Sequence, residues 1–150
     1  MSDPAQEAFV VALGALRRRE RSRAELIDLL QRRGVEREHA SAAIERLEQA
    51  GELDDARFAR RYAEDKRELS GWGPGRIRDA LVGRGVGLDD VEAALDADSD
   101  GEQLERAEEL LDRKGGDLDS DVARGRALGF LTRRGYEYEI AYEAVRRHAA

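Results

Sequence analysis

The stretch from Gly51 to Gly85, GELDDARFARRYAEDKRELSGWGPGRIRDALVGRG, decides the fold because the pattern at its end occurs twice more in the chain. The stretch closes on an arginine and a glycine, with Leu81 four residues before the glycine. The same Leu-x-x-Arg-Gly pattern ends at Gly34, 51 residues earlier, and at Gly135, 50 residues later. A pattern that returns at this interval predicts a tandem repeat of about fifty residues.

The residues that follow these three glycines keep the same register. An alanine stands nine positions beyond each glycine and an aliphatic residue stands ten positions beyond it: Ala43–Ile44, Ala94–Leu95 and Ala144–Val145. Around them, apolar residues recur at spacings of three and four, which is typical of amphipathic helices. We therefore predict an all-α fold of three tandem three-helix repeats, residues 1–51, 52–99 and 100–150, in which neighbouring repeats help to bury one another.

The composition narrows the classes of function. The chain of 150 residues has a net charge of -7, is 41% hydrophobic and 39% charged, and contains no cysteine. The lack of cysteine excludes disulfides and thiolate metal sites and fits a reducing cytoplasm. No stretch approaches the ~18 apolar residues of a membrane helix. The acidic net charge argues against nonspecific nucleic-acid binding as the main role, because that affinity comes from Lys and Arg at phosphates.

Several helices can be located from their first residues. Ser22 and Glu25 form a capping box, in which each side chain satisfies a free backbone amide. Asp54 is a suitable N-cap for the next repeat, and Asp55 adds a charge that the helix dipole favours in the first turn. Pro74 suits the first position of a helix. These two aspartates are therefore interpreted as caps and not as a metal or acid-base pair.

Two segments between helices lack apolar periodicity. Residues 96–101, DADSDG, predict a linker. Residues 71–75, GWGPG, lack the lysine and Ser/Thr of a phosphate-binding loop, so we interpret them as a flexible hinge. Trp72 in this loop is either a plug over the core of its own repeat or an exposed anchor for a partner.

No set of residues in the sequence indicates chemistry. His39 and His148 are the only histidines and lie in unrelated segments, and no nucleophile stands at a suitable spacing from a base. We expect no catalytic site, no cofactor and no metal ion.

The arginines around the end of the first helix are the best candidates for contact with a partner. The cluster consists of Arg17, Arg18, Arg19, Arg21 and Arg23, and it contains a single acid, Glu20. Most other arginines have acids nearby, which predicts solvated faces that neutralise themselves. The N-terminal cluster is suited to DNA phosphate or to an acidic partner surface.

A dense set of residues marks the middle repeat: Gly51, Leu53, Asp54, Asp55, Arg57, Phe58, Ala59, Tyr62, Gly71, Gly73, Pro74, Arg76, Ile77, Leu81, Arg84, Gly85 and Val86. Their order and spacing resemble the central signature of the RecX family of recombinase regulators. The chain departs from that pattern at Glu52, where the family often has an aromatic or apolar residue. The third repeat also departs from the repeat pattern, because Ala127 stands in the place of Leu26 and Ile77.

The resemblance implies a cytoplasmic bacterial protein that binds the RecA recombinase filament on DNA and inhibits its strand-exchange, ATPase and coprotease activities. Such a protein modulates homologous recombination, DNA repair and the SOS response by binding, and its repeats form an elongated, curved row. The family signature also favours a structural or partner contact for Arg57 and Arg76. We expect a monomer with no membrane contact, for which DNA contact is secondary.

Two other functions remain open from the sequence. The Arg-Gly step resembles the tight turn of helix-turn-helix units, so a direct DNA-binding regulator is the main alternative. A generic helical-repeat adaptor is the third reading.

Overall fold

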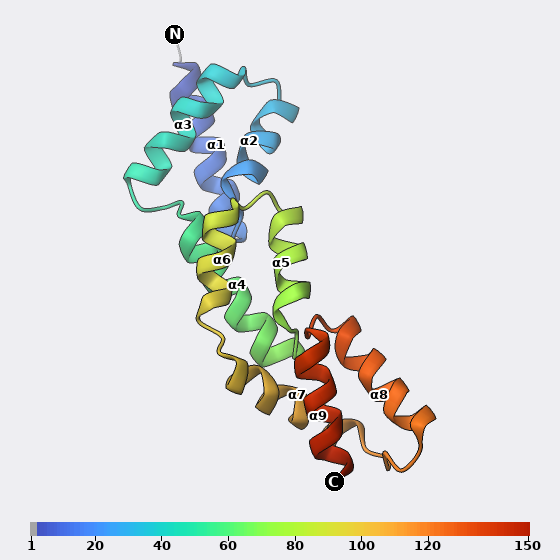
Figure 1. The fold of residues 1–150 in the computed structure, drawn as a ribbon. Helices are drawn as coiled ribbons and strands as arrows, with labels where there is room; N and C mark the ends of the chain where they lie inside the picture. The colour runs from blue at the N-terminus through green and yellow to red at the C-terminus, as the bar shows by residue number, and fades with distance from the viewer. Residues whose placement is uncertain (1–2) are drawn as a thin grey trace. The chain divides into compact units, whose positions relative to one another are not determined.

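The computed structural model describes residues 3–150, and this part of the chain contains nine helices and no strand (Figure 1). The helices are α1 (Pro4–Arg18), α2 (Arg23–Arg32), α3 (Arg37–Gln49), α4 (Asp55–Ser70), α5 (Pro74–Gly83), α6 (Leu88–Asp96), α7 (Asp100–Lys114), α8 (Asp121–Arg133) and α9 (Tyr138–Ala149). The prediction of an all-α fold is confirmed.

The predicted repeat register corresponds to a turn that has the same backbone form in all three places. Gly34, Gly85 and Gly135 adopt φ angles of 86°, 82° and 102°, in the left-handed region that favours glycine. The residue after each glycine donates its N–H to the carbonyl of the leucine four residues before the glycine, at 3.0 to 3.2 Å. Those leucines, Leu30, Leu81 and Leu131, are fully buried. The pattern therefore marks a helix end fixed by packing.

The described chain divides into two compact units. Unit 1 comprises Met1–Ala59 and Leu81–Val91, and unit 2 comprises Arg60–Ala80 and Glu92–Ala150. The division passes through α4, α5 and α6. The domain limits expected at residues 51/52 and 99/100 stay a prediction.

In unit 1, α1 and α3 lie side by side and α2 packs against both (Figure 1). The buried face of α1 consists of small side chains, Ala8, Ala12 and Ala15, which have no exposed surface. Small residues at a contact let helix axes approach closely. The larger buried side chains come from α2 and α3 and the loop after α3: Leu26, Leu30, Ile44, Leu47 and Leu53.

In unit 2, α9 packs against both α7 and α8. The buried core there contains Ala107, Leu110, Leu111, Ala127, Leu131, Tyr136, Ala141, Ala144 and Val145. Ala127 is buried at the position that Leu26 and Ile77 occupy in the other two repeats. The third repeat thus keeps the helical register with a smaller side chain.

The helix starts agree with the sequence. Ser22 and Glu25 make both hydrogen bonds of the capping box. Asp54 accepts a hydrogen bond from the Arg57 N–H at 3.1 Å, and α5 begins at Pro74. The linker prediction is wrong in extent, because α6 continues to Asp96 and α7 begins at Asp100, which leaves three residues between them.

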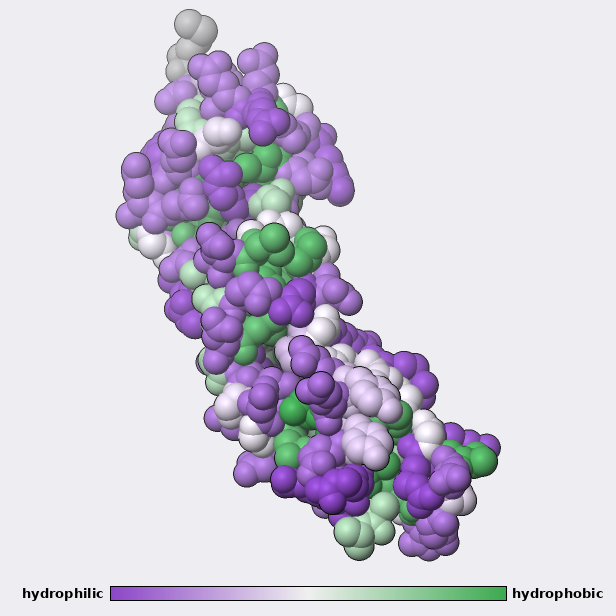
Figure 2. All heavy atoms as spheres, in the orientation of Figure 1, coloured by the Kyte–Doolittle hydropathy of each residue, from purple (hydrophilic) through white to green (hydrophobic). Residues whose placement is uncertain are grey.

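The surface is strongly polar. Figure 2 shows a face of the molecule on which hydrophilic residues predominate, with small apolar patches between them. No helix among residues 3–150 has the length and apolar character needed to cross a membrane. Hydrophilic side chains thus make up most of the surface that this face presents to a partner.

Candidate partner-binding surface

Three members of the N-terminal arginine cluster lie exposed at the end of α1. Arg17 and Arg18 form the last turn of the helix, and Arg19 is its C-cap. Positive charge is stabilised there by the negative end of the helix dipole. The side chains are exposed and, within the described residues, make no ion pair or side-chain hydrogen bond. They are therefore available to an anionic partner.

The other two members of the cluster are used within unit 1. The Nε of Arg21 donates to the Ala15 carbonyl at 3.4 Å, which covers the end of α1. Partial burial and the neighbouring Arg19 lower the pKa of Arg21. The Nε of Arg23 lies 3.2 Å from Glu48 Oε1. The structure thus separates three free arginines from two structural ones, a distinction that the sequence did not provide.

Arg57 also has a structural role in unit 1. Its guanidinium donates to the carbonyls of Gly51 and Glu52, at 3.1 and 3.4 Å, and so connects the first turn of α4 to the loop that follows α3. Of the two alternatives for this residue, the structural contact is the one seen.

Asp55 joins the starts of two helices in unit 1. Its carboxylate accepts a hydrogen bond from the backbone N–H of Arg23, the first residue of α2, at 2.9 Å. Burial raises the pKa of Asp55, against the opposing effect of this hydrogen bond. The residue therefore serves α2 as well as its own helix.

Trp72 in unit 2 is the centre of a cluster of rings and cations. Its side chain is half-buried, so it is neither a fully covered plug nor a free anchor. The Arg76 guanidinium carbon lies 4.2 Å from the Trp72 ring centroid and the Lys66 Nζ lies 4.7 Å from it. Tyr62 meets the same ring edge-on at 6.3 Å. Cations held over an aromatic face keep their charge in fixed positions, and Arg76 remains exposed.

The hinge interpretation of residues 71–75 is wrong, because the loop is hydrogen-bonded to the turn between α8 and α9. The N–H groups of Gly73 and Gly75 donate to the carbonyls of Arg134 and Gly135, at 2.7 and 2.9 Å. A Cβ at Gly73 would lie 2.6 Å from the carbonyl carbon of Gly135. The glycine at position 73 is needed for the close approach of two backbones.

The equivalent contact in unit 1 joins the turn at Arg84–Gly85 to the start of α2. The Ser22 hydroxyl donates to the Arg84 carbonyl at 2.5 Å. The Arg84 guanidinium makes a two-point contact with Glu25, at 3.0 and 3.1 Å. Burial alone would raise the pKa of Glu25, but the hydrogen bonds from Arg84 and Ser22 outweigh it, so the pKa is lowered.

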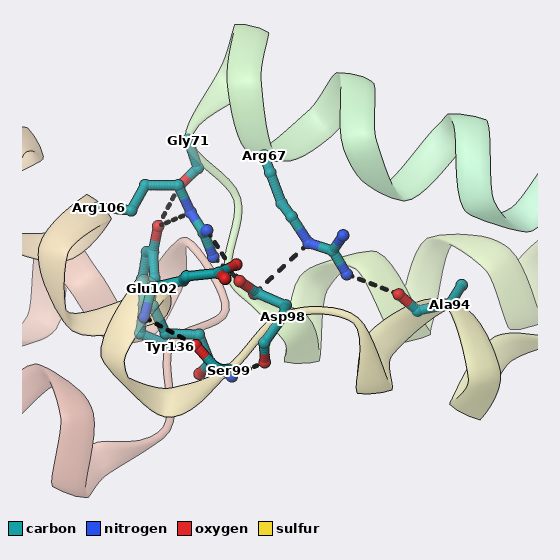
Figure 3. A network of polar contacts seen from close by, with 9 residues as sticks. Arg67, Gly71, Ala94, Asp98, Ser99, Glu102, Arg106 and Tyr136 are labelled. Carbon is teal, nitrogen blue, oxygen red and sulfur yellow. Dashed lines mark hydrogen bonds and ion pairs between the residues drawn. The ribbon is translucent and has the colours of Figure 1, made fainter.

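A buried ionic network centred on Asp98 in unit 2 was not predicted from the sequence (Figure 3). The Asp98 side chain has no exposed surface and lies 2.8 Å from Arg106 Nη2 and 3.4 Å from Arg67 Nε. Burial acts to lower the pKa of Arg106, but the hydrogen bonds and charge interactions with Asp98 and Tyr136 together outweigh burial, so the pKa is raised. Tyr136 accepts from Arg106 and donates to the Gly71 carbonyl, both at 2.9 Å.

Arg67 and Arg106 of this network also line a groove in which acidic side chains outnumber basic ones, which does not suit nucleic acid. The charged side chains that line the groove are five glutamates, Glu64, Glu68, Glu102, Glu105 and Glu109, and three arginines, Arg67, Arg106 and Arg113. Carboxylates in this number repel phosphate. Asp98 therefore holds α4, α6 and α7 together within unit 2. In sequence it is one of several acids in DADSDG, so only the fold could distinguish it.

The predicted partner-binding residues that remain available thus form two groups, one in each unit. Arg17, Arg18 and Arg19 are free cations in unit 1, whereas Trp72 and Arg76 belong to the ring and cation cluster of unit 2. No group of three or more potential ligands could hold a metal ion among residues 3–150. The chemistry that these surfaces offer is the binding of anionic groups.

Comparison with protein families matches two segments of the chain. The first three-helix domain of RecX matches residues 8–47, and the second three-helix domain of RecX matches residues 54–95. The two segments together cover more than half of the chain. They include α2 with its capping box and the signature region from Asp54 onward.

Relatives along most of the chain are named regulatory protein RecX. The protein from Stenotrophomonas maltophilia (strain R551-3) is 39% identical over 137 residues, which cover 90% of this chain and 83% of the relative. The protein from Xanthomonas campestris pv. campestris (strain B100) is 44% identical over 128 residues, 84% of this chain and 78% of the relative. The crystal structure of RecX from Lactobacillus salivarius shares the fold, with a TM-score of 0.86, 24% identity and coverage of 98% and 97% of the two chains.

Proposed function

Because this chain belongs to the RecX family of regulatory proteins, we propose that it binds the RecA recombinase filament on DNA and inhibits its strand-exchange, ATPase and coprotease activities. It acts by binding, without chemistry of its own, in the cytoplasm. In the cell this would modulate homologous recombination and the SOS response.

The observation that carries the proposal is the free end of α1. No ion pair within the described residues neutralises Arg17, Arg18 or Arg19, although the chain as a whole is acidic. Exposed like charges raise the electrostatic energy of a protein on its own and lower it on an anionic partner. A filament of protein on DNA presents phosphates and acidic side chains together, so it suits this cluster.

A second contact is assigned to Trp72 and Arg76 in unit 2. Tryptophan and arginine are the residue types that most often contribute strongly at protein interfaces. Here Arg76 is held over the indole at 4.2 Å, so little side-chain entropy is lost when it meets a partner. The net charge of -7 favours a protein surface next to DNA over DNA alone.

The proposal is tested by RecA ATP hydrolysis on single-stranded DNA during titration with this protein. We expect inhibition at or below one copy per RecA subunit. Exchanging Arg17, Arg18 and Arg19 together for glutamate should weaken inhibition and lower the melting temperature only slightly, because these side chains make no ion pair or side-chain hydrogen bond among the described residues and only the favourable charge at the end of α1 is lost. The matched control exchanges three other exposed arginines, Arg113, Arg126 and Arg133. Inhibition that survives the first exchange, or no inhibition by the parent protein, would overturn the proposal.

DNA binding without recombinase is the competing function, and the same arginines are its basis. A gel-shift titration with single-stranded and duplex DNA at two salt concentrations separates the two functions. Strong retention that depends on DNA sequence would favour a direct DNA-binding regulator. Weak retention that disappears with salt is expected here.

A further inference from the structure

The chain makes one kind of contact twice, each time within one unit. In unit 1 the Arg84–Gly85 turn docks on the first turn of α2 through Ser22 and Glu25. In unit 2 the Arg134–Gly135 turn docks on the start of α5 through Gly73 and Gly75. An Arg-Gly turn thus receives hydrogen bonds or ion pairs from residues at the start of the middle helix of the preceding repeat.

The first Arg-Gly turn, Arg33–Gly34, has no such partner within the described residues. Its backbone matches the other two, with φ of 86° at Gly34. A Cβ at Gly34 would meet nothing within 4 Å, whereas one at Gly85 would meet Ala24 at 2.5 Å and one at Gly135 would meet Arg76. Arg33 is exposed and makes no ion pair or side-chain hydrogen bond there. The docking element is therefore present but unused.

The third repeat contains a helix start of the kind that receives an Arg-Gly turn, but no turn of the described chain is docked on it. Ser120 caps α8 as Ser22 caps α2, and its Oγ accepts from the Ala123 N–H at 3.1 Å. Ser22 is fully buried beneath the Arg84–Gly85 turn, but Ser120 is exposed and its hydroxyl proton finds no acceptor in the described chain. Val122, at the place of Ala24 in the turn of helix after the cap, is 65% exposed. This segment, Ser120–Ala123, is a first turn of the same kind without a docked turn.

The charges of the two unused surfaces are complementary. Arg33 and Arg37 flank the free turn, with one acid, Glu36, between them and the neighbouring Arg32 paired with Asp28, whereas Asp117, Asp119 and Asp121 flank the Ser120–Ala123 segment. The Asp121 side chain is 98% exposed, with an ion pair to Arg124 on its own helix. Opposite charge on two surfaces favours their encounter.

From these observations we propose that the Arg33–Gly34 turn of one copy docks on the Ser120–Ala123 segment of a second copy, head to tail. The second copy repeats between molecules the contact that the chain already makes twice within itself. A contact between different surfaces extends into chains or closes into rings, as repeat proteins with uncapped ends do. The area is that of one turn, so the association is weak and seen only in concentrated protein. It requires neither RecA nor DNA, so it stands or falls apart from the proposed function.

Sedimentation velocity of the protein alone tests the proposal over a wide range of concentration. We expect the weight-average sedimentation coefficient to rise with concentration and to fall with added salt, because exposed ion pairs are screened. Arg33→Glu should abolish the rise. Arg32→Glu is the matched control on the neighbouring residue, which is engaged in an exposed ion pair with Asp28, and it should keep the rise. A coefficient that does not change with concentration, or equal effects of the two variants, would overturn the proposal.

A gain of association provides a second, independent arm. Ala123→Glu places a carboxylate at the third position of α8, where α2 carries Glu25. It should complete a capping box and pair with Arg33 of the next copy, which tightens association by up to about fivefold, the factor for one exposed ion pair. The gain should disappear in the double variant with Arg33→Glu. A gain that persists in the double variant would contradict the assigned pairing.

Cross-linking then identifies the two surfaces directly, since the chain contains no cysteine. Arg33→Cys protein is mixed with Ala123→Cys protein and treated with a short bismaleimide. The mixture should yield a covalent dimer that neither variant yields alone. Equal dimer from one variant alone would indicate a symmetric contact and overturn the head-to-tail arrangement.

Discussion

The Arg84–Gly85 and Arg134–Gly135 turns each contact the start of a helix of the preceding repeat, but the two contacts are made by different chemical groups. In unit 1 the contact between the Arg84–Gly85 turn and α2 is made by side chains, the Ser22 hydroxyl and the Glu25 carboxylate. In unit 2 the contact between the Arg134–Gly135 turn and α5 is made by backbone N–H groups, at Gly73 and Gly75. The repeated pattern specifies the turn, and the start of the receiving helix specifies how the turn is held.

The difference predicts different weaknesses in the two units. A contact between side chains responds to pH and salt, because one partner is a carboxylate. A contact between two backbones responds to steric bulk, because a Cβ at Gly73 has no room. The variants below test this contrast.

The largest effect is expected where the two units are alike. Leu81→Ala and Leu131→Ala each remove a fully buried side chain before the Arg-Gly step, and each should lower the free energy of unfolding by about 2 to 5 kcal/mol. Urea denaturation measures both losses. Leu69→Ala is the control, since Leu69 is 83% exposed and should change stability by less than about 0.5 kcal/mol. An unchanged stability for either core variant would contradict the common register.

The next effect belongs to unit 2 alone. Gly73→Ala forces a methyl group against the backbone of Gly135 and Tyr136, so we expect a loss of about 1 to 3 kcal/mol. Gly83→Ala in α5 meets nothing within 4 Å, and it should be neutral or stabilising by up to about 1 kcal/mol. Thermal unfolding of the pair decides. Equal stability of the two variants would mean that the glycine loop is not held by close backbone packing.

A smaller effect, with a pH dependence, belongs to unit 1. Glu25→Gln weakens the pairing with Arg84 and should cost about 1 kcal/mol near neutral pH. Because the folded pKa of Glu25 is lowered, the contribution of its carboxylate is complete above the ordinary pKa of about 4.3 and disappears as the pH falls through the folded value. Urea denaturation from neutral to acid pH should show the two proteins converge at low pH. A difference that stays constant with pH would show that the carboxylate charge has no part in the contact.

The smallest effect separates the two arginines. The Arg84 guanidinium makes two hydrogen bonds to the Glu25 carboxylate, whereas the Arg134 guanidinium donates to one carbonyl, that of Ser70, at 2.9 Å. Lysine cannot reproduce a two-point contact. Arg84→Lys should therefore cost about 1 kcal/mol and Arg134→Lys about 0.5 kcal/mol or less, as measured by thermal melts. The reverse order would contradict the assignment of the two chemistries.

Much of the fold could be predicted from the sequence because helix periodicity and helix ends are local. The glycines at the Arg-Gly turns, the leucines before them, the capping box at Ser22 and the N-cap at Asp54 all lie where the sequence placed them. Each of these depends on residues within a few positions along the chain.

What could not be predicted depends on residues distant in sequence. Asp98 is about thirty residues from Arg67 and a similar distance from Tyr136, so its burial has no local signature. The same holds for Gly73, whose partner turn is about sixty residues away. In the arginine cluster, composition could not show that Arg21 and Arg23 are engaged internally while Arg17, Arg18 and Arg19 are free.

The most direct test of the proposed function is co-sedimentation with the RecA filament assembled on single-stranded DNA. The protein should sediment with the filament and remain in the supernatant with DNA alone. The form with glutamate at positions 17, 18 and 19 should sediment less, although its melting temperature is lowered only slightly. Sedimentation with bare DNA to the same extent, or no sedimentation with the filament, would contradict the account of this protein as a filament-binding regulator.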